Sequence, residues 1–229
     1  NLIASANTYT NDYQQGYYVT NTMGSVWFGN DNYPHTSHTY GDPSTAFDAS
    51  GNAFISTIQY GGSDYLITKS TDKGNTWSIP VSGNATTSSF DKEMIAADNM
   101  PNSPFANNIY VAWTDFGSLN WDVKINRSID GGATFTAPIS LKISKFGQGT
   151  NVQTGPNGEV YVCWADYPNS LPATGIGFVS SLNGGVSFSP ATVVFTCSGI
   201  RVSNGSNSLF NNIRVNDFYP TSAWFDGEI

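Results

Sequence analysis

The sequence predicts an all-β fold made of small antiparallel sheets that repeat along the chain. Three observations lead to this prediction. An eight-residue motif recurs about every fifty residues, an apolar strand precedes each copy at a similar distance, and Asn-Gly, Asp-Gly and Gly-Gly pairs punctuate the strands. Such pairs are typical of turns between hairpin strands, and regular spacing is typical of repeat folds. No segment has a sustained 3.6-residue apolar rhythm, so we expect little helix.

The motif reads STDKGNTW at residues 70–77, SIDGGATF at 128–135 and SLNGGVSF at 181–188. A Gly between polar residues favours a turn with positive φ, where neighbouring side-chain oxygens accept hydrogen bonds from backbone N–H groups. We therefore expect hairpins closed at residues 72–74 and 130–132, and a structural role for the shared positions. These positions are Ser70, Asp72, Gly74, Trp77, Ser128, Asp130, Gly132, Phe135, Ser181, Asn183, Gly185 and Phe188.

A fourth segment, TNTMGSVW at residues 20–27, keeps only the Gly and the Trp of this motif. The four motif glycines, Gly24, Gly74, Gly132 and Gly185, lie 50, 58 and 53 residues apart. That interval is long enough for one small sheet per repeat.

An apolar strand lies upstream of each motif, with the sequences GNAFIST at 51–57, NNIYVAW at 107–113 and NGEVYVCW at 157–164. Phe54, Tyr110 and Tyr161 align and precede their motif Gly by 20, 22 and 24 residues, and Ile3 takes this place in the first repeat. Period-two alternation predicts a sheet with two distinct faces. An opening strand comes before each of these, at residues 41–48, 90–98 and 147–155, and a further such segment runs over 218–229. Each full repeat therefore has four predicted strands.

The eight-residue motif resembles the Asp box, or BNR repeat, of sialidase-like β-propellers. Segments such as DKEMIAAD, NNIYVAWTDF and RVNDFYP are most similar to bacterial BNR-repeat proteins that are classed as sialidase-like by fold. The resemblance implies one propeller domain or fragment over residues 1–229. Its expected parts are a partial blade at 1–40, blades at 41–89, 90–146 and 147–217, and the first strand of a further or closing blade at 218–229.

Two arrangements of these blades stay open. The chain is either part of a larger propeller of six or seven blades, or a ring of four blades in which the last strand completes the first blade. We favour the larger propeller, because Asp-box propellers usually have six or more blades.

Composition narrows the classes of partner. The chain has 11 % charged residues, a net charge of −8 and only nine Lys plus Arg residues, which argues against a nucleic-acid partner. It has no apolar run of 18 residues, so we expect no membrane span. The low Lys content, the many Asn and Thr residues and the resemblance together indicate an extracellular or cell-surface protein, with other domains of a larger protein as possible neighbours.

No cofactor or metal site is expected. His35 and His38 are the only histidines, and on a loop near Asp31 and Asp42 we expect them to face solvent rather than to bind a metal. Two cysteines, Cys163 and Cys197, are compatible with either a disulfide or two thiols.

The resemblance does not extend to a sialidase active site. Sialidases of this superfamily hold the substrate carboxylate with three arginines and use a Tyr/Glu nucleophile pair with an Asp acid–base. Here the arginines are Arg127, Arg201 and Arg214, and no Phe/Tyr-Arg-Ile-Pro motif precedes the first Asp box. Catalytic residues stay unassigned, and enzymatic activity stays open.

A ligand is expected where the loops that enter the innermost strands converge on the propeller axis. The candidates are Asp42, Lys92, Glu93, Arg214 and Tyr219, which combine charged groups and an aromatic ring suited to a sugar. Simple alternation would place Asp91 and Glu93 on one face of their strand and Lys92 on the other. The alternative is that these residues form only solvated turn and ion-pair contacts.

Three functions remain. The first is a glycan-binding propeller, or the non-catalytic part of a glycan-active protein. The second is a glycoside hydrolase or lyase completed by residues in other blades. The third is a protein-interaction or adhesion scaffold.

Overall fold

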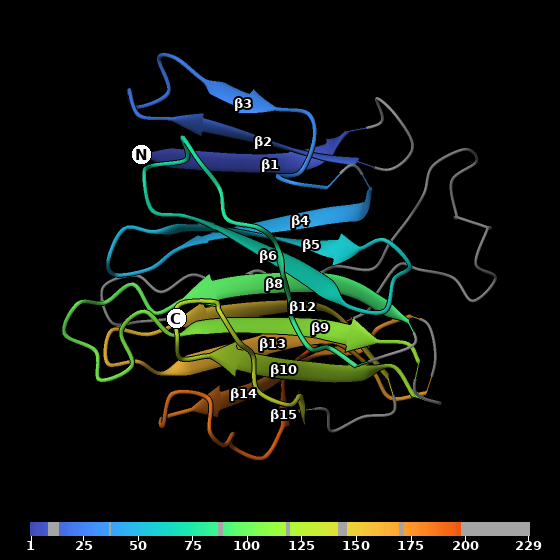
Figure 1. Ribbon diagram of the computed structural model, residues 1–229. Helices are drawn as coiled ribbons and strands as arrows, with labels where there is room; N and C mark the ends of the chain where they lie inside the picture. The colour runs from blue at the N-terminus through green and yellow to red at the C-terminus, as the bar shows by residue number, and fades with distance from the viewer. Residues whose placement is uncertain are drawn as a thin grey trace.

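The computed structural model describes residues 1–8, 14–36, 38–86, 89–117, 120–141, 146–169 and 172–197. These residues form fifteen β-strands in four antiparallel sheets, in chain order (Figure 1). No helix occurs in these ranges, so no described segment has the form of a membrane-spanning helix.

The sheets are assembled from consecutive strands. The first sheet has three strands, β1 (Leu2–Thr8), β2 (Gln14–Thr20) and β3 (Phe28–Asn30). The second has four, β4 (Thr39–Phe47), β5 (Ala53–Gln59), β6 (Tyr65–Ser70) and β7 (Val81–Ser82). The third contains β8 (Phe90–Ala97), β9 (Ile109–Asp115), β10 (Asp122–Ser128) and β11 (Ile139–Ser140). The fourth contains β12 (Phe146–Thr154), β13 (Val160–Tyr167), β14 (Gly175–Ser181) and β15 (Thr192–Thr196).

The sheets pack face to face in the order of the sequence (Figure 1). The opening strand of each full sheet contacts the opening strand of the next, β4 against β8 and β8 against β12, while β1 packs on β4. This succession of four-stranded sheets with their first strands innermost is the blade arrangement of a β-propeller. Among the described strands, none of the first sheet packs extensively on the fourth. The segment 218–229, expected to begin or close a blade, lies outside the described residues.

The hydrophobic core is divided between successive pairs of sheets. Tyr65, Ile67, Phe90 and Trp113 are buried between the second and third sheets. Trp164 belongs to the corresponding cluster between the third and fourth sheets. Because neighbouring residues of a strand point to opposite faces, the third sheet contributes side chains to both clusters.

The repeated motif forms one hydrogen-bonded turn in each full sheet. In the third sheet, the Gly132 amide donates to Ser128 Oγ at 2.8 Å and the Thr134 amide donates to Asp130 Oδ1 at 2.9 Å. Thr134 Oγ1 also donates to Asp130 Oδ2 at 2.6 Å. The bonds to Asp130 hold the pKa of its carboxyl down at about 2, and the side-chain bond from Thr134 is the largest cause. The second and fourth sheets repeat these backbone contacts through Ser70, Asp72, Ser181 and Asn183.

The segment at residues 20–27 forms the same turn with different chemistry. Thr20 Oγ1 accepts from the Gly24 amide at 3.1 Å, and Thr22 Oγ1 accepts from the Val26 amide at 2.8 Å. Two hydroxyl groups thus take the places of the Ser and the Asp. The sequence pattern had missed this because it counted residue types and not oxygen acceptors.

The motif glycine of each full sheet packs on the preceding sheet. A Cβ atom at Gly132 would lie 3.2 Å from Phe54 Cε1, and one at Gly185 would lie 2.9 Å from Tyr110 Cε1. Gly74 approaches Val19 still more closely, with 2.6 Å to Cγ2. In the third and fourth sheets the motif Gly therefore meets the upstream aromatic of the preceding repeat.

Both cysteines fall within the described part of the chain, and both are thiols. Cys163 is buried in β13, as a small apolar side chain would be, and Cys197 is half-buried.

Candidate functional site

The same β-bulge interrupts the innermost strand of each full sheet. Pairing with the neighbouring strand shifts between Gly41 and Ser44 in β4, between Asp91 and Met94 in β8, and between Gln148 and Asn151 in β12. In each case the inner strand has one extra residue relative to its partner, which is the definition of a bulge.

Every bulge contains one residue in the left-handed region. The φ angles are 52° at Asp42, 56° at Lys92 and 69° at Gly149. Positive φ is uncommon for residues other than Gly, and for Lys in particular. The backbone at Asp42 and Lys92 is therefore held in a costly conformation that re-aims two charged side chains, and such conformations concentrate at functional sites.

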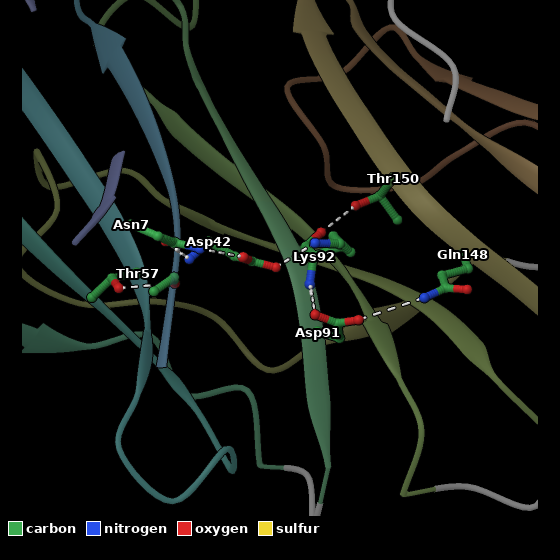
Figure 2. Close-up of polar contacts among 8 residues, drawn as sticks. Asn7, Asp42, Thr57, Asp91, Lys92, Gln148 and Thr150 are labelled. Carbon is green, nitrogen blue, oxygen red and sulfur yellow. Dashed lines mark hydrogen bonds and ion pairs between the residues drawn. The ribbon is translucent and has the colours of Figure 1, made fainter. Parts of the chain in front are cut away.

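These bulges bring polar groups from all four sheets into one continuous row (Figure 2). We call Asn7, Asp42, Lys92, Asp91 and Gln148 the inner polar row. Asn7 Oδ1 accepts from the Asp42 amide at 2.7 Å, and its Nδ2 donates to Asp42 Oδ1 at 3.1 Å. The other Asp42 oxygen forms an ion pair with Lys92 Nζ. The first, second and third sheets are thus joined by side chains at their inner edge.

The row continues from the third sheet to the fourth (Figure 2). The Lys92 amide donates to Asp91 Oδ1 at 3.0 Å, and Gln148 Nε2 donates to Asp91 Oδ2 at 3.5 Å. Thr150 Oγ1 lies 3.0 Å from the Lys92 carbonyl oxygen and 3.0 Å from that of Ala112. Thr150 therefore fixes the backbone that presents Lys92.

A close backbone approach makes the first contact of the row possible. A Cβ atom at Gly41 would lie 2.3 Å from Asn7 Oδ1, so no other residue fits there without displacing Asn7. Gly41 also has a φ of 75°, and its carbonyl accepts from Thr57 Oγ1 at 3.0 Å.

The row is partly open to solvent. The side chains of Lys92 and Asp42 are 28 % and 27 % exposed, so their charges can reach a ligand. Asp91 is more enclosed, and burial is the main reason that its pKa is raised, although the positive charge of Lys92 opposes the rise. The row therefore combines an exposed ion pair with a carboxyl and an amide that are held more deeply.

Glu93 does not join the row. The side chain is only 1 % exposed, and neither carboxyl oxygen has a hydrogen-bond partner elsewhere in the described structure. Burial raises the pKa of Glu93 well above its usual value, and the nearby Asp42 and Asp91 raise it further. Asp91 contacts the fourth sheet while Lys92 reaches the second. Asp91 and Lys92 therefore point to opposite sides of β8, as simple alternation predicted.

The other expected residues lie elsewhere. Arg214 and Tyr219 are outside the described residues, as is Arg201. Arg127 donates from Nη1 to the Gly184 carbonyl in the next motif turn, so it joins the third sheet to the fourth. His35 Nε2 lies 2.8 Å from the Trp77 carbonyl oxygen, and the described ranges contain no group of three His, Cys, Asp or Glu residues that could hold a metal ion.

Aromatic side chains lie on two sheets at the end where the row lies. Tyr40 and Tyr60 are exposed, with ring centroids 5.1 Å apart, and Tyr40 is two residues before Asp42. On the fourth sheet, Phe146 lies two residues before Gln148 and packs on Trp121 at 5.0 Å. Aromatic faces beside polar groups are typical of ligand sites.

Sequence reasoning missed three contributors to this arrangement. Asn7, Thr57 and Thr150 are ordinary strand residues in the sequence, and they become relevant only through contacts with the bulges. The sequence did contain one sign of the bulges. Gly, Asp, Lys and Gln, which are uncommon inside strands, occur at equivalent positions of successive repeats.

Comparison with solved structures finds proteins of similar fold whose names describe glycan-active enzymes. A Hadza microbial sialidase matches with a TM-score of 0.56 at 14 % identity, over 87 % of this chain and 45 % of that one. An α-L-arabinofuranosidase from Fusarium graminearum matches with a TM-score of 0.58 at 12 % identity, over 86 % and 65 %. A polysaccharide lyase, an ulvan lyase, matches with a TM-score of 0.55 at 14 % identity, over 84 % and 52 %.

At these identities the likeness shows the fold. The chain spans from under half to about two thirds of the length of these proteins. No protein-family description and no curated protein sequence matches the chain.

Proposed function

We propose that this chain is a glycan-binding β-propeller, or the glycan-recognising part of a larger glycan-active protein, at the cell surface or outside the cell. The observation that carries the proposal is the inner polar row. It places one ion pair, one carboxyl and two amide side chains at the inner ends of four sheets, and it is partly open to solvent.

Sugars are recognised by several directional hydrogen bonds together with an aromatic surface. Lys92 offers donors, Asp42 offers acceptors, and Tyr40 and Tyr60 offer exposed rings close by. The proteins of similar fold support the same class of ligand, since their names describe a sialidase, an arabinofuranosidase and an ulvan lyase. Assignment to the Asp-box family is part of this proposal, and its support is the turn made by four copies of the motif.

A second function, glycoside hydrolysis, is favoured by one observation. Glu93 is a buried carboxyl with a raised pKa near Asp42 and Asp91, and a protonated carboxylic acid is one of the two groups that most glycosidases need. In this version, blades outside residues 1–229 supply the remaining groups. Hydrolysis of an arabino-oligosaccharide by a protein that includes those blades, lost in Glu93→Gln, would support it.

The test of the binding proposal is calorimetric titration of the chain with sialyllactose, arabinohexaose and an ulvan oligosaccharide. Lys92→Met removes the ammonium group and retains most of the apolar stem. We expect it to weaken binding of the recognised oligosaccharide about tenfold or more, because a charge-assisted hydrogen bond contributes roughly 1.5–3 kcal/mol.

Lys124→Met is the matched control. Like Lys92, Lys124 forms an ion pair with an aspartate, and its Nζ lies 2.6 Å from Asp115 Oδ2. Both residues of this pair belong to the third sheet, and Lys124 is on β10, two strands outward from the inner strand β8. We expect this variant to bind as the wild type does. Equal binding by both variants and the wild type would place the glycan site away from the inner polar row.

A further inference from the structure

A second hollow lies between the first and second sheets, built from residues that the inner polar row does not use. It measures about 680 Å³, and its lining includes Tyr17, Asn30, Asn32, His35, Asn75 and Trp77. We call it the intersheet groove. The lining combines strand residues of the first sheet, the connection that leads to the second sheet, and the end of the motif turn at residues 70–77.

The groove has an ordered aromatic wall. The rings of Tyr17 and Trp77 meet edge to face, with centroids 5.3 Å apart and an interplanar angle of 67°. His35 closes the wall through its ring nitrogen, which lies 2.8 Å from the Trp77 carbonyl oxygen. The His35 backbone has a φ of 61°, a conformation that non-glycine residues rarely adopt, so the fold holds this side chain in place at a cost.

Polar groups of the groove are left available. Among the described residues, none bonds to the Tyr17 hydroxyl or to the side-chain amide of Asn32, although Asn30 Oδ1 accepts from the Asn32 amide nitrogen of the backbone at 2.9 Å. The Asn32 side chain is exposed. A hydroxyl and amides beside an aromatic wall match the alternating hydroxyl and C–H surfaces of a sugar ring.

The lining of the intersheet groove is uncharged, which favours neutral sugars over acidic ones. It contains no Lys, Arg, Asp or Glu, whereas the inner polar row contains an ion pair and a further carboxyl. The groove therefore lacks the cationic group that would recognise a uronate, sulfate or sialic acid. Its volume lies within the range of small-molecule sites.

We propose that the intersheet groove is a second saccharide site, specific for neutral sugar units, and that it acts independently of the inner polar row. Tyr17 and Trp77 form its aromatic wall, and the Tyr17 hydroxyl and the Asn32 amide bond to sugar hydroxyls. The proposal does not rest on the function assigned to the row, because the two share no residue.

Three neutral oligosaccharides, xylohexaose, mannohexaose and arabinohexaose, serve as probes in calorimetric titrations of the full chain. We expect at least one to bind. Tyr17→Phe combined with Asn32→Ala should weaken it about tenfold, because two hydrogen bonds are lost. Both changes leave the ring packing intact, and thermal melts check that the double variant is folded.

Two controls separate this site from the inner polar row. Asn21→Ala makes the same change at an exposed residue outside the groove, and Lys92→Met changes only the row. Both should leave the neutral hexasaccharide affinity within twofold of the wild type.

The inference is overturned if the double variant binds as the wild type does, if Lys92→Met abolishes binding of the neutral probe, or if none of the three probes binds. Loss of sialyllactose binding in Lys92→Met would test the inner polar row alone and would not bear on the intersheet groove.

Discussion

At the residue scale, the motif turn depends on side-chain oxygens more than on charge. Asp130 accepts backbone bonds from Ala133 and Thr134, and Asn183 makes the equivalent bonds with its amide oxygen in the fourth sheet. In the first sheet a threonine hydroxyl suffices. The common requirement is an acceptor for amide groups that the turn would otherwise leave unpaired.

Asp130→Ala should lower the free energy of unfolding by about 0.5–1 kcal/mol, the usual cost of losing such an acceptor at an exposed position. Asp130→Asn should retain most of that stability near pH 7. The carboxyl pKa is about 2 in the folded chain, below its unfolded value of about 3.9. Its charge-dependent contribution is therefore present above pH 3.9 and lost as pH falls toward 2.

Urea unfolding between pH 2 and pH 7 measures both effects. The difference between wild type and Asp130→Asn should shrink as the pH falls. An unchanged midpoint for Asp130→Ala would show that the carboxylate contributes nothing to the turn.

Glu93 should have the opposite pH dependence. Burial raises its folded pKa well above the unfolded value of about 4.3, so the neutral form is favoured in the folded chain. Its stabilising contribution is full below pH 4.3 and decreases as the pH rises toward the folded pKa, with a slope approaching about 1.4 kcal/mol per pH unit.

Glu93→Gln keeps the shape of the side chain and removes its titratable carboxyl group. Subtracting its pH profile from that of the wild type should give a curve that falls between pH 4.3 and the folded pKa. The measurement is denaturant unfolding from pH 4 to pH 9. Parallel profiles for the two proteins would mean that Glu93 titrates normally.

At the element scale, the motif turn also acts between sheets. Gly74 packs on Val19 of β2, Gly132 on Phe54 of β5, and Gly185 on Tyr110 of β9. A turn that closes one hairpin is thus seated on the sheet before it. The upstream aromatic of one repeat thus supports the motif Gly of the next, as Phe54 does for Gly132 and Tyr110 for Gly185.

Gly74→Ala should be more destabilising than Gly24→Ala. Both glycines take the fifth position of the motif and have similar φ angles, 85° and 91°. Alanine in this left-handed region costs about 1–2 kcal/mol at either site. Only Gly74 has a neighbour: its Cβ would lie 2.6 Å from Val19, whereas Gly24 has open space around it.

Overpacking against the buried Val19 should add about 1–3 kcal/mol to the cost of Gly74→Ala. Urea melts of the two variants measure the difference directly. Equal destabilisation would show that the sheets adjust to the added methyl group. The close contact between Gly74 and Val19 would then contribute nothing to the free energy of unfolding.

At the scale of the whole molecule, the sequence was sufficient for the fold and insufficient for the site. Repeats of strand, strand, motif and turn predicted sheets of four strands, because turn chemistry and period-two alternation are local properties. The inner polar row is not local. Asn7 meets Asp42 across 35 residues, and Lys92 meets Asp42 across 50.

The bulges account for the rest of the difference. Counting residues along β8 placed Asp91 and Lys92 on opposite faces, but it did not reveal the extra residue of the bulge or the burial of Glu93. No residue type marks a bulge that carries Lys in the left-handed region. Asp42 and Lys92 were nonetheless both among the expected ligand-binding residues, because they recur at one position of the repeat.

At the bulges, the residues that could contact a ligand are distinct from the residues that pair the strands. Residues 42, 92 and 149 occupy one place in three successive sheets as Asp, Lys and Gly, while the strands around them keep their pairing. A position that the sheet leaves unpaired can change without altering the strand pairing around it. Ligand preference in this architecture can therefore diverge through single substitutions at the inner edge, one sheet at a time, and related chains could recognise different molecules on an unaltered framework.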